Sequence, residues 1–245
     1  MNSGKKILLL GVYGMEMVEC GGVLCKNALA GGQSHAAVFF AGPEMRTDLE
    51  KAAAILGCST EYLDFDIGTL SGSPEERLAV ANVIRRFRPD IVITQDPEHC
   101  VRDLDPGRRP AMTTLLEGMA LAGRAYRVPE DLSPWGGFTV YYMTPETPNC
   151  LVDITDVWDR KTAAMDALDS QLEFIGQLVA GSGLPYGRLI PGYDGLTTDL
   201  DRGRAVKELW DRSYHLYHGS TGHNRVFLSE DFRKDSLFCL DMLIQ

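Results

Sequence analysis

The chain has no uninterrupted apolar run of the roughly 18 residues that a membrane-spanning helix needs. It also has no excess of positive charge, because 24 Lys and Arg residues stand against 34 Asp and Glu residues and give a formal net charge of −10. A scattered acidic surface repels phosphate backbones. Lys5 and Lys6 lead straight into an apolar segment without a cleavable signal pattern. We therefore expect a cytoplasmic protein with no membrane span and no nucleic-acid partner.

Cysteine pairing is another missing feature. The six cysteines form no CxxC pair and are too sparse for a small secreted domain that is stabilised by disulfides. We expect them to be reduced, and most of them to be small buried residues.

The segment from Lys6 to Gly22, KILLLGVYGMEMVECGG, joins an apolar strand to a glycine turn and the start of a helix. A continuous apolar run such as Ile7 to Leu10 is typical of a strand of a parallel sheet that is buried on both faces. The turn has neither the spaced glycines of a dinucleotide-binding loop nor a Walker lysine. Phosphate binding at this turn is therefore not expected.

Strands and helices alternate four times in the first half of the chain. The clearest helix start is Ser73 to Glu76, SPEE, with a serine N-cap, a proline at the first helical position and a glutamate three residues after the cap. This alternation predicts a parallel sheet with right-handed crossovers. The expected strands are 7–10, 35–40, 61–65 and 91–94, and the expected helices start at 17, 47 and 74.

The second half is less regular. It predicts a polar loop over 95–109, a helix over 110–122, strands over 139–143 and 151–154, a long helix over 156–178, a loop over 184–199 and a helix over 201–217. A length of 245 residues suits one domain. We expect an α/β fold over 1–245: a Rossmann-like core in 1–125 with a mostly parallel sheet and helices on both faces, and a C-terminal elaboration in 126–245.

Several segments together resemble the PIG-L (LmbE-like) family of zinc-dependent de-N-acetylases: ILLLG followed by CGG, EKAAAILG, SPEERLAVANVIRRFRPDIVITQDPE, KTAAMDALDSQ and SEDFR. RPDIVITQDPE after an amphipathic helix is the most specific of them. The resemblance covers most of the chain, to about Phe232. It implies a Rossmann-like fold and the removal of acetyl groups from amino sugars and related glycosides.

The motifs that carry the family's chemistry are altered here. Where family members have Ala-His-Pro-Asp-Asp, with two zinc ligands and a general base, this chain has the residues 12–16, VYGME, and only Glu16 can bind a metal or accept a proton. The nearest counterpart of the second motif, His-Pro-Asp-His, is DPGR at 105–108, so Arg108 stands in place of a zinc histidine. Catalytic zinc needs about three protein ligands, and a guanidinium cation repels the metal. We predict that zinc is not bound, and we predict no other cofactor.

The remaining polar residues define a candidate site for a small, sugar-like ligand. Glu16 and Asp96 are the candidate acid and base, although Asp96 precedes a proline and equally suits a turn cap. Arg108 would pair with Glu16 or Asp96, or bind an anion. A surface role is the alternative for Arg46 and Arg108. The candidate ligand-binding residues are Tyr13, Arg46, Asp96, Asp105 and Arg108.

Histidines offer two weaker metal hypotheses. His99 and Cys100 could join Glu16 and Asp96, but adjacent loop residues rarely both point inward. The group His215, His218 and His223 lies near a helix end, where partial positive charge is favourable, and we prefer that interpretation.

Two functions remain open. The favoured one is a non-zinc pseudoenzyme of the PIG-L fold that binds a ligand or partner chain. The alternative is an active hydrolase or lyase with a rebuilt site that uses Glu16 and Asp96. The sequence leaves homo- and hetero-oligomers equally open.

Overall fold

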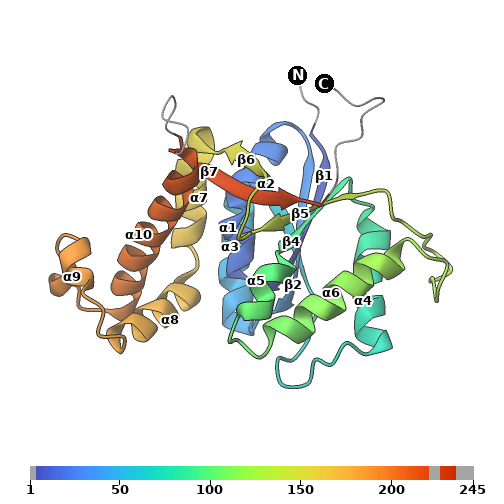
Figure 1. The fold of residues 1–245 in the computed structure, drawn as a ribbon, viewed down its shortest axis with the longest axis horizontal. Helices are drawn as coiled ribbons and strands as arrows, with labels where there is room; N and C mark the ends of the chain where they lie inside the picture. Colours follow the sequence, from blue (N-terminus) through green and yellow to red (C-terminus); the bar gives the residue numbers. More distant parts are fainter. Residues whose placement is uncertain (1–3, 221–226, 236–245) are drawn as a thin grey trace.

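The computed structural model describes residues 4–220 and 227–235 and contains one seven-stranded sheet (Figure 1). The strand order is β3-β2-β1-β4-β5-β7-β6. The strands are β1 (Lys6–Tyr13), β2 (Gln33–Phe40), β3 (Cys58–Tyr62), β4 (Ile91–Gln95), β5 (Thr139–Met143), β6 (Cys150–Asp153) and β7 (Ser229–Lys234).

The first five strands of the sheet run parallel. Leu9 at the centre of β1 lies opposite Ala36 of β2 and Ile93 of β4. Only β7 runs against its neighbours, since it pairs antiparallel with both β5 and β6. The carboxyl ends of β1, β4 and β5 therefore meet at one edge, where α/β folds bind ligands. The predicted mostly parallel Rossmann-like sheet is confirmed.

Helices cover both faces of the sheet (Figure 1). On one face α4 packs against α6, and on the other α3 and α2 pack against α7. Beyond this second layer α8 packs along α10 and forms the C-terminal elaboration. The helices are α1 (Met15–Glu19), α2 (Gly21–Leu29), α3 (Pro43–Leu56), α4 (Pro74–Phe87), α5 (Pro97–Arg102), α6 (Arg108–Ala122), α7 (Trp158–Asp166), α8 (Asp169–Ala180), α9 (Tyr186–Leu189) and α10 (Asp199–Gly219).

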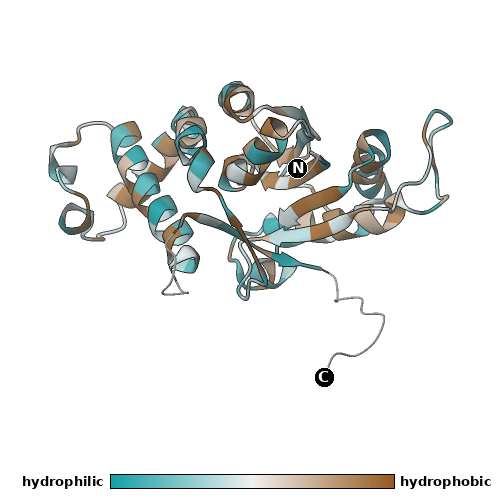
Figure 2. Ribbon diagram, turned by 90° about the horizontal axis from the view of Figure 1, so that it is seen from above, coloured by the Kyte–Doolittle hydropathy of each residue, from teal (hydrophilic) through white to brown (hydrophobic). Residues whose placement is uncertain are grey.

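Two hydrophobic cores fill the space between these layers. One packs Leu8 and Leu10 of β1 against α4 and α6, and the other packs Ile7 and Leu9 against α1, α2 and α7. The alternation arises because successive strand residues point to opposite faces. Figure 2 shows the hydrophobic residues concentrated on the central strands, while α10 carries long hydrophilic stretches.

Several predicted boundaries are wrong. The first helix is two helices, α1 and α2, with a break at Cys20. The third strand lies at Cys58–Tyr62 instead of 61–65, because Gly57 takes a left-handed φ of 70° and turns α3 directly into β3. The predicted loop over 95–109 contains α5, which Asp96 caps through a hydrogen bond from the Glu98 N–H at 2.9 Å.

The C-terminal half departs further from prediction. The long helix over 156–178 is α7 followed by α8, with a break at Leu168, whose φ of −88° and ψ of 54° are not helical. The expected loop over 184–199 contains α9, and β7 was not predicted as a strand. No helix among the residues described is long and apolar enough to cross a membrane.

Candidate functional site

The first strand-to-helix turn holds a buried carboxylate at the carboxyl edge of the sheet. β1 ends at Tyr13 and α1 begins at Met15, so Glu16 lies in the first helical turn and is only 3% exposed. Its Oε2 accepts a hydrogen bond from the Val12 N–H at 2.8 Å. One oxygen of Glu16 therefore holds the turn together, and Oε1 is left for another partner.

That partner is Arg108, the first residue of α6. Its Nη1 lies 2.6 Å from Glu16 Oε1 and also donates to the side-chain oxygen of Gln95 at the end of β4. Its Nε lies 2.7 Å from a carboxylate oxygen of Asp103. The guanidinium carbon stands 5.0 Å from the centre of the Tyr13 ring. Arg108 thus joins the ends of β1 and β4.

Tyr13 and Asp105 complete the same arrangement. The Tyr13 hydroxyl donates to Asp105 Oδ2 at 2.6 Å, and Asp105 Oδ1 accepts from the Gly107 N–H at 2.8 Å, which shapes the turn into α6. The structure therefore brings together Tyr13, Glu16, Asp105 and Arg108 of the sequence-predicted site. We call these four residues together with Gln95 and Asp103 the Arg108 cluster.

Burial dominates the electrostatics of this cluster. It raises the pKa of Glu16 from its ordinary value of 4.5 to about 7, although the positive charge of Arg108 acts in the opposite direction. Burial also raises the pKa of Tyr13, and the hydrogen bond to Asp105 adds to that effect. Burial tends to lower the pKa of Arg108, but the Glu16 carboxylate outweighs it, so the guanidinium stays charged.

Asp96 lies at the end of β4 in a different arrangement. Its two carboxylate oxygens accept hydrogen bonds from Nε and Nη2 of Arg233 at 2.7 and 2.9 Å, in addition to capping α5. Asp96 is fully buried, and Arg233 comes from β7. The turn-capping alternative therefore describes its local role, and both oxygens are already occupied.

Arg46 of α3 has contacts away from the Arg108 cluster. Its Nε donates to the Ala41 carbonyl oxygen at 2.8 Å, and its guanidinium pairs with Asp64 and lies 4.7 Å from the centre of the Tyr62 ring. These contacts tie Arg46 to the β3 side of the sheet. No contact joins it to Glu16 or Arg108 among the residues described.

The residues of the Arg108 cluster do not fit a catalytic zinc ion. The guanidinium of Arg108 lies directly against Glu16, the one candidate metal ligand in the first turn, and a cation there repels a metal. His99 and Cys100 do not supply the missing metal ligands. The half-exposed His99 lies 3.7 Å from Glu146, whereas Cys100 is buried beside Gln95. Throughout 4–220 and 227–235, no group of three His, Cys, Asp or Glu side chains is arranged to hold a metal.

His215 does not fit the prediction that the C-terminal histidines bring favourable positive charge to the end of a helix. His215 is 3% exposed, its Nδ1 lies 2.8 Å from the Ser229 carbonyl oxygen, and burial lowers its pKa to about 2. It is therefore neutral at pH 7, so it brings no positive charge to the end of α10. His218 does lie in the last turn of α10 and faces Asp231 at 3.6 Å, and His223 is outside the described residues.

Sequence reasoning missed Gln95, Asp103 and Arg233 as parts of the site. Asp103 had a local signal, since DLDPGRR places two aspartates just before the arginine that one of them pairs with. Arg233 lies in the SEDFR segment, but nothing local indicated its partner, because its strand was not predicted and Asp96 is 137 residues away.

No known protein-family model matches the chain. One relative, a 4-oxalmesaconate hydratase from Pseudomonas putida KT2440, is 27% identical over 135 residues, which are 51% of this chain and 50% of the hydratase. The chain thus matches about half the length of that relative.

Two solved structures have the same architecture over nearly all of the chain. GalB, the 4-carboxy-2-hydroxymuconate hydratase from Pseudomonas putida KT2440, has a TM-score of 0.62 and 19% identity, with 100% of both chains covered. The N,N'-diacetylchitobiose deacetylase from Pyrococcus horikoshii has a TM-score of 0.69 and 19% identity, with 94% of this chain and 84% of the deacetylase covered. The resemblance to the PIG-L (LmbE-like) family is confirmed at the level of the fold.

Proposed function

We propose that this protein is a zinc-independent member of the PIG-L fold that binds a small, sugar-like anionic ligand at the Arg108 cluster and does not deacetylate amino sugars. The observation that carries the proposal is the 2.6 Å contact between Arg108 and Glu16. The guanidinium of Arg108 stands at the edge of the sheet where family members hold zinc. It supplies a positive charge there, but it cannot activate a water molecule as zinc does.

The ligand class follows from the donors that remain. Arg108 Nη1 donates to Glu16 and Gln95, and Nε lies 2.7 Å from an Asp103 carboxylate oxygen without forming a hydrogen bond, whereas Nη2 donates to none of the residues described. The side chain is 17% exposed, so a ligand can reach it. A guanidinium nitrogen with a free N–H suits a carboxylate, and the neighbouring Tyr13 ring offers an apolar face. A sugar acid combines both features.

Binding of D-glucuronate is the direct test, with D-glucose as the neutral control, measured by calorimetric titration. We expect saturable binding of glucuronate and at least tenfold weaker binding of glucose. Arg108→Met should abolish glucuronate binding, whereas Arg102→Met, which removes an exposed arginine paired with Glu146, should leave it unchanged. Equal binding of both sugars, or binding that survives Arg108→Met, contradicts the proposal.

A second candidate is a lyase or hydrolase that uses Glu16 as acid and base. It is favoured by the pKa of about 7 of Glu16, since a group that titrates near the working pH transfers protons efficiently. The hydratase relative also supports it. Because Arg233 engages both oxygens of Asp96, the proton transfers fall to Glu16. Turnover of an unsaturated or glycosidic acid that is lost in Glu16→Gln, with a folded variant, would establish this function over the first.

A further inference from the structure

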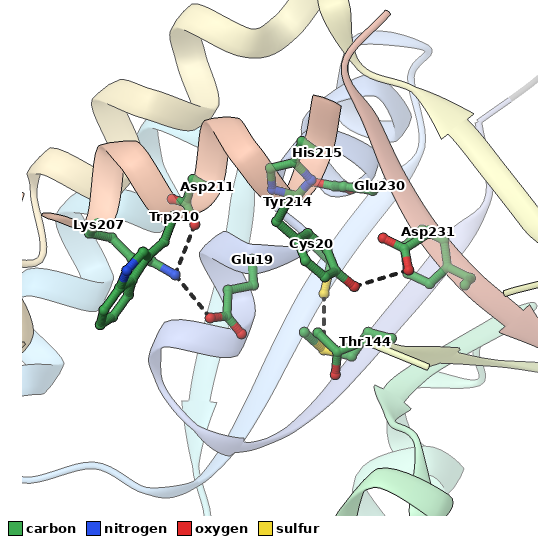
Figure 3. A pocket seen from close by; sticks show the side chains of 12 residues that line it. Glu19, Cys20, Thr144, Lys207, Trp210, Asp211, Tyr214, His215, Glu230 and Asp231 are labelled. Carbon is green, nitrogen blue, oxygen red and sulfur yellow. Dashed lines mark hydrogen bonds and ion pairs between the residues drawn. The ribbon is translucent and has the colours of Figure 1, made fainter. Parts of the chain in front are cut away.

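A pocket lies beyond the Arg108 cluster, one turn further along α1, between α1, α10 and β7 (Figure 3). Its volume is about 170 Å³, slightly more than the roughly 150 Å³ of an engineered cavity that binds benzene. Glu19 at the end of α1 and Cys20 directly after it line the pocket, and Asp231 lines it from β7. The pocket therefore has room for a ligand of about one ring.

Its one lining lysine, Lys207, lies between two carboxylates. Lys207 Nζ lies 3.1 Å from a carboxylate oxygen of Glu19 and 2.9 Å from one of Asp211, as the dashed lines in Figure 3 mark. Burial alone would lower the pKa of Lys207, but these two carboxylates raise it, so the ammonium is charged and already balanced. Glu230, also in the lining, is balanced by Lys161 at 2.8 Å.

Asp231 differs from the other lining carboxylates. It is 3% exposed and pairs with no lysine or arginine of the described residues. Its Oδ2 accepts the Tyr214 hydroxyl at 2.9 Å, but Oδ1 accepts no hydrogen bond from them, and the ring nitrogen Nδ1 of His218 lies 3.6 Å from Oδ1. A buried carboxylate oxygen without a donor is unfavourable unless something binds to it.

A second buried polar atom of the lining also has no partner. Thr144 follows β5 directly, and its Oγ1 forms no hydrogen bond with the described residues. Its φ of 48° is unusual for a β-branched residue. Asp231 Oδ1 and Thr144 Oγ1 are therefore two buried oxygen atoms in the pocket lining that a ligand could hydrogen-bond.

Aromatic rings supply the remaining recognition. Trp210 and Tyr214 line the pocket from α10 and are 40% and 38% exposed, which is high for rings of this size. The faces of such rings attract organic cations. By formal charge, four carboxylates around the pocket, those of Glu19, Asp211, Glu230 and Asp231, stand against two lysines, Lys207 and Lys161. Burial raises the pKa of Asp231, and a cation bound beside it would act in the opposite direction.

We infer that this pocket is a second binding site, and that it takes a small organic cation: a primary ammonium group on an apolar body of about one ring. The ammonium group would donate to Asp231 Oδ1, and the apolar body would lie beside Trp210. The site is separate from the Arg108 cluster and does not depend on the function proposed for that cluster.

Benzylamine, with benzyl alcohol as the neutral control of the same size, is a suitable probe by titration calorimetry at neutral pH. We expect saturable binding of benzylamine and at least tenfold weaker binding of benzyl alcohol. Asp231→Asn keeps the acceptor for Tyr214 but removes the charge, and it should weaken benzylamine binding at least tenfold. Glu173→Gln, which removes a carboxylate from a different surface hollow, should leave binding unchanged.

Each possible outcome of these titrations either supports or overturns the inference. Equal affinity for the amine and the alcohol would mean an apolar cavity without a cation site and would overturn the inference. No saturable binding of benzylamine, or binding that Asp231→Asn leaves intact in a folded variant, would also overturn it. Arg108→Met should keep benzylamine binding, so loss of the first site does not remove the second.

Discussion

Lys161 and Glu230 form an ion pair of 2.8 Å in the interior, where they are 1% and 2% exposed. Lys161 Nζ also donates to the carbonyl oxygens of Val18 and Glu19, which end α1. Glu230 accepts the N–H groups of Gly22 and Val23, which begin α2, at 2.7 and 2.8 Å. The pair therefore satisfies both backbone ends at the break between the two helices.

Removing one partner of this pair should destabilise the protein strongly. Lys161→Met leaves Glu230 charged and buried, so we expect a loss of about 3–5 kcal/mol in the free energy of unfolding, measured with urea. The more exposed pair of Lys26 and Asp156, 2.6 Å apart, is the control, and Lys26→Met should cost about 1 kcal/mol or less. Similar losses of stability in the two variants would show that the buried pair stabilises α1 and α2 no more than an exposed ion pair does.

Glu16 should make stability depend on pH. Its pKa is about 7 in the folded protein, where burial outweighs the effect of Arg108, and 4.5 is its ordinary value. Between these two pH values the folded chain binds more protons at Glu16 than the unfolded chain does, so this residue's contribution to stability falls as pH rises from 4.5 to 7. Each pKa unit corresponds to about 1.4 kcal/mol.

Urea unfolding of the wild type and of Glu16→Gln, compared at several pH values across that window, isolates this contribution. The stability of the wild type relative to the variant should decline by a few kcal/mol as the pH rises. If the two stability curves run parallel, Glu16 titrates near its ordinary pKa and cannot serve as a proton donor at pH 7.

Close packing of α8 against α10 depends on glycine. A Cβ on Gly203 would lie 1.8 Å from the carbonyl oxygen of Leu172, so α10 would have to move away from α8. Alanine favours a helix over glycine by about 1 kcal/mol, yet we expect Gly203→Ala to reduce stability by about 1–3 kcal/mol. Gly181→Ala is the control, because the nearest atom to its added Cβ is 4.0 Å away. A stabilised Gly203→Ala variant would contradict the close approach.

The sequence predicted the parts of the fold whose signals are local. The SPEE motif gives α4 a capping box between Ser73 and Glu76, and the apolar run of β1 gives a strand at the centre of the sheet. Each of these elements carries its own pattern of caps or burial, so its position can be inferred without knowing its neighbours.

β7 could not be predicted in this way. Ser229, Glu230 and Asp231 are buried polar residues in a strand, and the partner of each lies on a helix: Ser229 donates to the carbonyl oxygen of His215, Glu230 pairs with Lys161, and Asp231 accepts from Tyr214. Polar residues normally indicate exposed loops. The break at Leu168 is likewise invisible locally, because Asp48, 122 residues away, accepts the Ser170 N–H that begins α8.

The candidate site was predicted in part for the same reason. The sequence predicted that Arg108 pairs with Glu16 or Asp96 or binds an anion, because Glu16 and Arg108 stand where the family has metal-binding motifs, and the structure pairs it with Glu16. It did not place Gln95 or Asp103 around Arg108, since their roles depend on how α5 and α6 fold back over β4. The geometry of a site built from three separate segments becomes visible only when the segments are assembled.

The zinc content of the purified protein shows most directly whether Arg108 has taken the place of the metal. The protein would be purified without chelators, incubated with two equivalents of zinc, dialysed and measured by mass spectrometry of the metal, beside Glu16→Gln. We predict far less than one zinc per chain in both proteins, because the Arg108 guanidinium already pairs with the Glu16 carboxylate that a metal would need as a ligand. One tightly held zinc per wild-type chain, lost in Glu16→Gln, would contradict this prediction.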